Sequence, residues 1–325
     1  MVQWYNGIAQ LTIPTPFVVG DVHVYVIKEE KLTLVDTGPK TKEAWLSLEG
    51  QLKELGIAPE DIKQIVLTHH HPDHAGLIDR FDQAVVLGAA ETNRFLVRED
   101  AFMEMHDTFY ETSFKEIGVP EAYFVLIEKM REPLQALGQR GLDKTVAPHD
   151  FVPGAREWKV IETPGHAQGH ISLFRERDGL LIGGDMLLAK VSSNPLIEPP
   201  FSPQEERPIP QLQYNESLKK LLDLPISSVL PGHGPVVENA HTLIHQRLKK
   251  QHERACYVKQ LLIEKEATAF ELCVALFPSV YRKQLGLTLS ETMAQIDYLL
   301  SIGEIEQVDL IGDAVVYRAL ANTKE

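Results

Sequence analysis

Four potential metal ligands in one short segment constrain this chain more than any other feature. Within six positions the sequence places His69, His71, Asp73 and His74. They follow an apolar stretch at residues 64–67 that predicts a short buried strand. Neutral imidazole suits zinc and similar metals, and a carboxylate oxygen can share the same ion. The alternative, a solvated polar turn, accounts less well for four suitable side chains so close together.

A turn directly after a strand can aim alternate residues at one point. We therefore predict that His69 and His71 face one ion, and that Asp73 and His74 turn toward a second. Three later segments repeat the arrangement of strand, glycine and ligand. The predicted strands at residues 158–161, 180–182 and 228–230 are followed by His166, Asp185 and His233. Each segment alone is weak evidence, but together they predict loops that converge at one edge of a sheet.

At this point the sequence resembles the metallo-β-lactamase superfamily. The motifs of that family occur here in order: Asp36-Thr37-Gly38, the cluster at residues 69–74, His166, Asp185 and His233. The resemblance covers about residues 15–240. It implies an α+β fold, a four-layer αβ/βα sandwich in which two packed sheets have helices outside.

The resemblance also implies a ligand set for two divalent ions. Asp36 matches a supporting aspartate, and we assign Asp36 and His170 to orienting the ligands rather than binding metal. His70 is treated as a non-ligand, and we assign catalytic roles to Asp73 and Asp185. The first ion would be held by His69, His71 and His166, the second by Asp73, His74 and His233, with Asp185 bridging both.

Two ions about 3.5–4 Å apart can hold a bridging water and lower its pKa to about 7. We therefore predict a hydrolase in which a metal-bridging hydroxide attacks the substrate. Zinc is the default metal, with iron or manganese as alternatives, because the spacing of the ligands does not distinguish them. Cys256 and Cys273 lie outside the predicted metal domain and are expected to be core residues rather than nucleophiles.

Elsewhere the sequence predicts a hairpin at residues 22–27 and 32–35, a helix at 41–55 and a strand at 84–87. Residues 91–142 are rich in Phe and Met, and their pattern predicts a helical insertion. After residue 240 we expect a long helix at 241–265, helices at 270–277 and 290–302, and a strand at 314–320. This order resembles a small winged-helix module, so we divide the chain into 1–240 and 241–325.

Three substrate classes remain open. The apolar insertion favours a small ester, thioester or lactone, because it could wall an acyl-binding pocket. The C-terminal module resembles that of the β-lactamase-like protein 2 family, some members of which cleave single-stranded RNA. A glyoxalase II-like hydroxyacylglutathione hydrolase uses the same histidine motif, but its C-terminal region looks different.

Charge argues against nucleic acid, which we keep only as the disfavoured alternative. The chain carries a formal net charge of −14, and phosphate backbones repel acidic surfaces. The helix at 290–302 contains Glu291 and Asp297 but no Lys or Arg. We predict that the basic residues Arg247, Lys249 and Lys250 form a solvated helix face.

The remaining expectations concern location and assembly. The chain shows no secretory signal, no apolar run of the roughly 20 residues that span a bilayer, and only two cysteines. These features predict a cytoplasmic protein that acts on a small molecule and not at a membrane. A homodimer is a candidate assembly, because winged-helix-bearing relatives are often dimers. His106 and His149 are expected to be exposed and outside the pocket.

Overall fold

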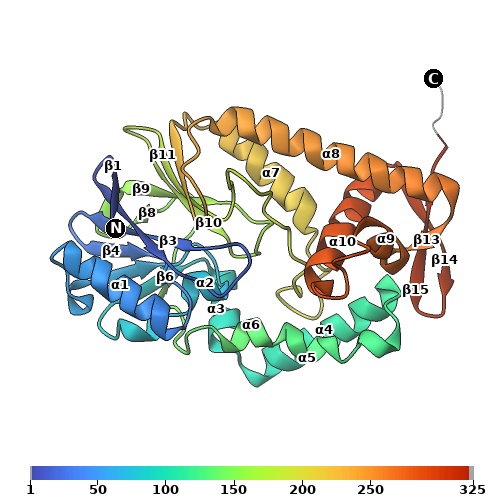
Figure 1. The fold of residues 1–325 in the computed structure, drawn as a ribbon, viewed down its shortest axis with the longest axis horizontal. Helices are drawn as coiled ribbons and strands as arrows, with labels where there is room; N and C mark the ends of the chain where they lie inside the picture. The colour runs from blue at the N-terminus through green and yellow to red at the C-terminus, as the bar shows by residue number, and fades with distance from the viewer. Residues whose placement is uncertain (1, 322–325) are drawn as a thin grey trace.

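Two β-sheets packed face to face form the centre of the molecule in a computed structural model that describes residues 2–321 (Figure 1). The seven-stranded sheet runs β1 to β7 in spatial order, and the five-stranded sheet runs β12-β11-β10-β9-β8. The first sheet comprises β1 (Gln3–Tyr5), β2 (Ile8–Ile13), β3 (Val22–Lys28), β4 (Leu32–Val35), β5 (Gln64–Val66), β6 (Val85–Gly88) and β7 (Lys144–Thr145). The second comprises β8 (Phe151–Val152), β9 (Ala155–Glu162), β10 (Ile171–Arg175), β11 (Leu180–Gly184) and β12 (Ser228–Pro231).

The central strands β3, β10 and β11 are buried on both faces, which explains their nearly continuous apolar runs. Between the sheets, Ile27 and Val66 of the first sheet pack in one cluster with Trp158, Leu173 and Ile182 of the second. Burial of this interior is the main source of stability for the sandwich.

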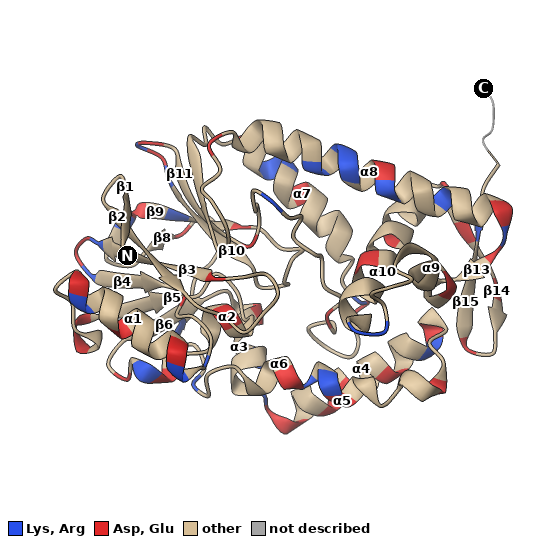
Figure 2. Cartoon of the chain, in the orientation of Figure 1, with Lys and Arg blue, Asp and Glu red and all other residues tan. Residues whose placement is uncertain are grey.

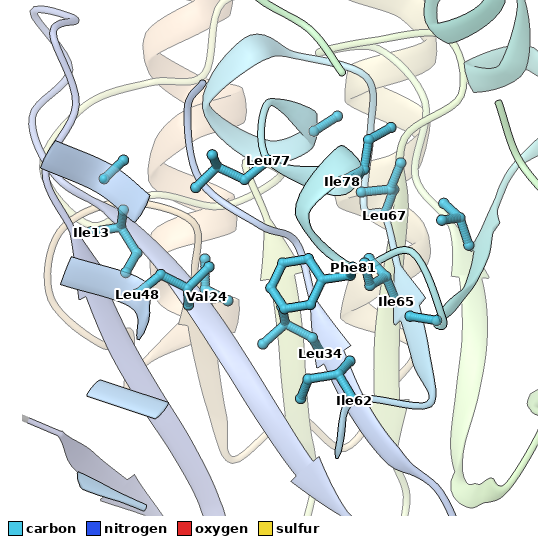
Figure 3. Close-up of a cluster of buried hydrophobic side chains, with 14 of the residues drawn as sticks. Ile13, Val24, Leu34, Leu48, Ile62, Ile65, Leu67, Leu77, Ile78 and Phe81 are labelled. Carbon is cyan, nitrogen blue, oxygen red and sulfur yellow. The ribbon is translucent and has the colours of Figure 1, made fainter. Parts of the chain in front are cut away.

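Helices cover the outer faces of both sheets, giving the four layers that the family resemblance implies. Helix α1 (Lys42–Glu54) packs on the first sheet, where Leu48 lies beside Val24 in a buried cluster that also contains Leu34 and Phe81 (Figure 3). Thr41 caps this helix by accepting a hydrogen bond from the Ala44 N–H at 3.1 Å. On the second sheet, helices α7 (Pro210–Leu222) and α8 (Ala240–Glu264) share a cluster with β10 and β11.

The predicted insertion is helical and begins one residue earlier than expected. It contains α3 (Ala90–Val97), α4 (Asp100–Ile117), α5 (Leu126–Met130) and α6 (Glu132–Gln135). A short helix α2 (Pro72–Ala75) precedes it at the metal motif. The C-terminal part contains α9 (Ala269–Leu276), α10 (Leu285–Ser301) and a sheet in the order β13-β15-β14, with β13 (Ala267–Thr268), β14 (Ile305–Ile311) and β15 (Ala314–Ala319).

The insertion and the C-terminal part share one apolar core. Phe114 and Ile127 of the insertion lie in the same buried cluster as Leu262, Leu289 and Ile296. In Figure 1, α8 runs along one side of the molecule and α4 with α5 along the other, with α10 between them. Our division of the chain at residue 240, and the identification of a winged helix, stay predictions.

Several elements differ from the sequence predictions, and helix α7 and strands β7 and β8 were not predicted at all. Strands β1 and β2 were not predicted, although β2 is buried and pairs with β3 along its length. Helix α10 starts five residues before the predicted boundary at 290. Gly286 argues against a helix there, but Leu285 and Leu289 are buried in the shared core, and this packing outweighs the weak propensity of one glycine.

Candidate metal centre

The predicted ligands meet at the edge where several strands end. His69 follows β5, His166 follows β9, Asp185 follows β11 and His233 follows β12. Strands β4, β5 and β6 are mutually parallel, as are β11 and β12, so their carboxyl ends lie on one side. The loops after these strands therefore deliver side chains from distant parts of the sequence to one place.

The donor atoms form two groups with one residue between them. In the first, His71 Nδ1 lies 3.0 Å from both His69 Nε2 and His166 Nε2. Ligands at the usual zinc distances of about 2.0–2.1 Å in a tetrahedron lie about 3.3 Å apart, so this spacing suits a shared ion. The second group comprises Asp73, His74 and His233, all of whose ligand atoms lie within 4.8 Å of one another.

Asp185 lies between the two groups. One of its carboxylate oxygens is 3.6 Å from His166 Nε2 in the first group and 3.6 Å from His233 Nε2 in the second. The other oxygen is 3.5 Å from His74 Nε2. This is the position that a bridging carboxylate requires. The ligand roles themselves remain a proposal.

Hydrogen bonds fix the ring orientation of three of these histidines. The Nδ1–H groups of His74, His166 and His233 face the Asp36 carboxylate, the Asn194 carbonyl and the Asp21 carbonyl, at 2.8, 2.9 and 2.8 Å. Because these oxygens accept only, each ring donates through Nδ1 and presents Nε2 to the other donor atoms.

The electrostatics suit metal binding. Burial holds the pKa of His69 and of His71 well below the ordinary value, so both rings are neutral. At Asp185 burial opposes ionisation, but His74 and His233 hold its pKa well below the usual range. Against burial, the Asp185 carboxylate raises the pKa of His74 and of His233, so a metal ion would displace a proton from these two rings.

Unpartnered polar atoms test whether a metal fits. His74 Nε2, Asp185 Oδ1 and His233 Nε2 are buried and have no hydrogen-bond partner among the described residues. Such atoms cost free energy unless something binds them. A Cβ at Gly232 would lie 2.2 Å from Asp185 Oδ1, so only glycine leaves room for these donors. The residues therefore fit a pair of divalent ions.

Asp36 and His170 lie directly behind the donors. Asp36 accepts hydrogen bonds from the Thr68 N–H and hydroxyl, both at 2.8 Å, besides its contact with His74. His170 Nε2 accepts from the Asp185 N–H at 3.1 Å, while its Nδ1 faces the Thr163 hydroxyl at 2.8 Å. Burial lowers the pKa of His170 to about 3, so its ring stays neutral.

Glu198 is a site residue that the sequence analysis missed. Its carboxylate lies 3.4 Å from His70 Nε2 and accepts from the Gln168 N–H at 2.9 Å. The ligand atoms of His70, His71 and Glu198 also lie within 4.8 Å of one another. The ring of His70 stacks on the ring of Phe95, with the two ring centroids 3.6 Å apart. The sequence signal for Glu198 was a lone acidic residue between apolar residues and a pair of prolines. We had interpreted this loop only from its proline content.

A cavity of about 480 Å³ opens beside the first metal group. His71 and Glu198 line the side of the cavity nearest the donor groups, which we call the metal edge. Helices α4, α5, α6 and α10 supply most of the remaining wall. His106 also lines it and is buried, so the prediction that this histidine is exposed was wrong. It lies on the inner face of α4, whose ring contacts with Phe102 and Tyr110 place it in the packed interior. His149 is exposed, as predicted.

The cations of α8 are largely engaged within the molecule. Arg247 donates to the carbonyls of Leu188, Ala189 and Val191, at 2.8, 3.2 and 2.8 Å. Lys249 lies 3.7 Å from Glu253, and acidic residues lie among the basic ones along the helix in Figure 2. Arg247 is therefore a structural residue and not part of a solvated helix face.

The comparison with known families decides the identity of the fold. The family model described as the metallo-β-lactamase superfamily matches residues 18–233. The chain belongs to the metallo-β-lactamase superfamily. This segment contains both donor groups. The chain is therefore a metal-dependent hydrolase of that superfamily.

Relatives match most of the chain. The probable metallo-hydrolase YqjP of Bacillus subtilis (strain 168) is 41% identical over 295 residues, covering 90% of this chain and 92% of the relative. A β-lactamase-like protein 2 homolog of Caenorhabditis elegans is 27% identical, covering 80% and 72%. A crystal structure of a metallo-β-lactamase family protein from Thermus thermophilus superposes with a TM-score of 0.80 at 30% identity, covering 97% of this chain and 99% of that one. Within residues 2–321, no helix has the length and apolar character needed to cross a membrane.

Proposed function

We propose that this protein is a dinuclear hydrolase of small esters, thioesters or lactones. The observation that carries the proposal is the cavity of about 480 Å³, which connects the metal edge with apolar walls. Its size lies within the range of about 300–1,000 Å³ typical of small-molecule sites. A substrate whose carbonyl lies near His71 would have its acyl group against Phe114, Leu134 and Leu289.

The metal ions would be held by the residues predicted from the sequence. His69, His71 and His166 would bind one, Asp73, His74 and His233 the other, and Asp185 both. Zinc fits this mainly imidazole donor set, with iron or manganese as alternatives. When bound, two such ions lower the pKa of a shared water and polarise the substrate carbonyl.

The chain itself supplies orientation, charge and exclusion of water. Asp36 and His170 hold the rings and the Asp185 backbone in place, and we propose that Asp73 and Asp185 are the carboxylates closest to the reaction. The apolar walls keep bulk water from the acyl group, which strengthens electrostatic interactions in the site. The two cysteines, Cys256 and Cys273, lie outside the donor groups, and the Ser193 hydroxyl lies 3.0 Å from His166 Nδ1, the ring nitrogen opposite the donor atom Nε2.

The other substrate classes gain less support. An RNA endonuclease needs cations that face a phosphate backbone. Arg247, however, is bonded to three carbonyls, and Lys249 lies beside Glu253. Neither a glyoxalase II-like activity nor a homodimer is favoured by a specific contact in the described residues, and both remain alternatives.

The test is a substrate panel assayed on metal-loaded protein, with acyl thioesters, lactones, aryl esters, phosphodiesters and single-stranded RNA. We expect carbonyl-ester turnover that disappears in His69→Ala, because that variant removes a donor of the first ion. RNA cleavage without ester turnover would replace the proposal. Equal turnover by the variant would show that the activity does not arise at this centre.

A further inference from the structure

Three cations line the cavity away from the metal edge. Lys129 belongs to α5, while Arg282 and Lys283 precede α10. All three residues are exposed, although they line the cavity, so they lie at its mouth. The acidic residues that line the same cavity are Glu198, which is buried at the metal edge, and Glu132.

These cations are available to a ligand. Among the described residues, Lys129 and Lys283 make no ion pair or side-chain hydrogen bond, and Arg282 bonds through Nε to the Tyr281 hydroxyl at 2.9 Å. By contrast, Arg318, elsewhere in the C-terminal part, is paired with Glu306 and Glu266. The mouth is thus locally basic on a chain whose net charge is −14.

The space between the mouth and the metal edge is mainly apolar. Phe114, Ile117, Leu126, Met130 and Leu289 supply side chains to it. An apolar chain in this space would be removed from water, which favours its binding. An anion at its far end would meet the cations without being buried, which avoids the cost of desolvating a charge.

We propose that the substrate is an anionic amphiphile, an ester or thioester joined to a negatively charged group through an apolar chain. The scissile carbonyl lies at the metal edge, the chain fills the cavity, and the anion lies between Lys129 and Lys283. Water adds to the carbonyl carbon, the bond to the ester oxygen or thioester sulfur breaks, and the products are a carboxylic acid and an alcohol or thiol. This inference rests on the proposed hydrolase function.

The anion can come from either half of the substrate, and three probes of similar chain length distinguish these sources. The p-nitrophenyl monoester of octanedioic acid carries its charge on the acyl chain. The S-acetyl thioester of 8-mercaptooctanoic acid carries its charge on the leaving group, and p-nitrophenyl octanoate is neutral. Each probe is assayed on the metal-loaded full chain and on the double variant Lys129→Glu/Lys283→Glu.

We expect the double variant to raise KM about tenfold for the anionic probe that uses this mouth, at low salt, with kcat unchanged. Added salt should shrink the effect, because exposed charges are screened. KM for the neutral ester should stay the same. The double variant Lys42→Glu/Lys53→Glu, on the exposed face of α1, is the matched control and should leave KM unchanged for all three probes.

Two failures can be told apart. If the wild type hydrolyses the esters but the mouth variant leaves KM unchanged for both anionic probes, the anionic substrate is wrong and the hydrolase function stands. The same conclusion follows if the control variant raises KM as much as the mouth variant does. If the metal-loaded wild type hydrolyses no probe, the proposed function fails, and this inference fails with it.

Discussion

Asp36 shows how much of the centre depends on one side chain outside the donor set. Its carboxylate accepts from the backbone and hydroxyl of Thr68 and also from His74 Nδ1. It adopts φ +61°, a left-handed conformation that asparagine and aspartate tolerate better than other side chains. The motif Asp-Thr-Gly therefore has a structural cause at its first position, where a short acceptor on a left-handed backbone is needed.

Asp36→Asn tests this role while keeping size and backbone conformation. The amide replaces one accepting oxygen with a donor, so His74 or Thr68 loses its partner. We expect metal affinity to fall about 10–100-fold, measured by competition with a chelator. Asp82→Asn, at an exposed position, is the control. Equal affinities in all three proteins would show that Asp36 does not orient His74.

Glu198 gives a pH dependence with a definite sign. Burial raises the pKa of its carboxyl from 4.5 to about 7. The folded state therefore holds this proton at pH values where the unfolded state has released it. The stability associated with the raised pKa is fully present below pH 4.5 and is lost as the pH rises to about 7, by about 3 kcal/mol.

Glu198→Gln should remove that dependence, because glutamine has no proton to release. The measurement is the free energy of unfolding of metal-free wild type and variant between about pH 4.5 and 7.5. We expect the wild-type value minus the variant value to fall as the pH rises. A difference that stays constant across this range would show that Glu198 titrates normally in the folded protein.

At the scale of elements, the central strands and helix α8 were predictable because their apolar patterns are local. Strand β5 and helix α8 lie within one residue of the predicted boundaries. Helix α10 was predicted too short because its first turn is stabilised by contacts with a core that includes the insertion. Sequence patterns contain no record of such long-range packing.

The residues of the candidate site also divide into those with a local sequence signal and those defined by long-range contacts. His69 and His71 could be found because they lie in a compact motif, and Asp185 because it follows a strand beside glycine. Glu198 was missed because its partner Gln168 lies 30 residues away. Arg247 was misread because its three carbonyl partners lie in a distant loop.

Arg247 and Lys249 on α8 provide a matched pair at this scale. Arg247→Ala leaves three carbonyls without their donor, and we expect a loss of about 1.5–3 kcal/mol in the free energy of unfolding. Lys249→Ala removes only an exposed contact at 3.7 Å and should change stability by less than about 0.5 kcal/mol. Urea unfolding of both variants measures these changes. Equal losses in the free energy of unfolding would contradict the structural role of Arg247.

At the scale of the whole molecule, the cavity is a product of three parts of the chain. The sandwich supplies the metal edge, the insertion supplies α4 and α5, and the C-terminal part supplies the start of α10. The insertion and the C-terminal part also share an apolar core. Substrate selection is therefore expected to depend on residues far from the metal motif, and point variants test it better than deletions.

The central claim is that two ions are bound in two donor groups joined by Asp185. The most direct measurement is the metal content of purified, zinc-loaded wild type, His233→Ala and Asp82→Asn by elemental analysis. We predict about two ions per chain in the wild type and in Asp82→Asn, and about one in His233→Ala, because the first donor group stays complete. A wild type that binds no more than one ion, or a His233→Ala variant that still binds two, would contradict the account.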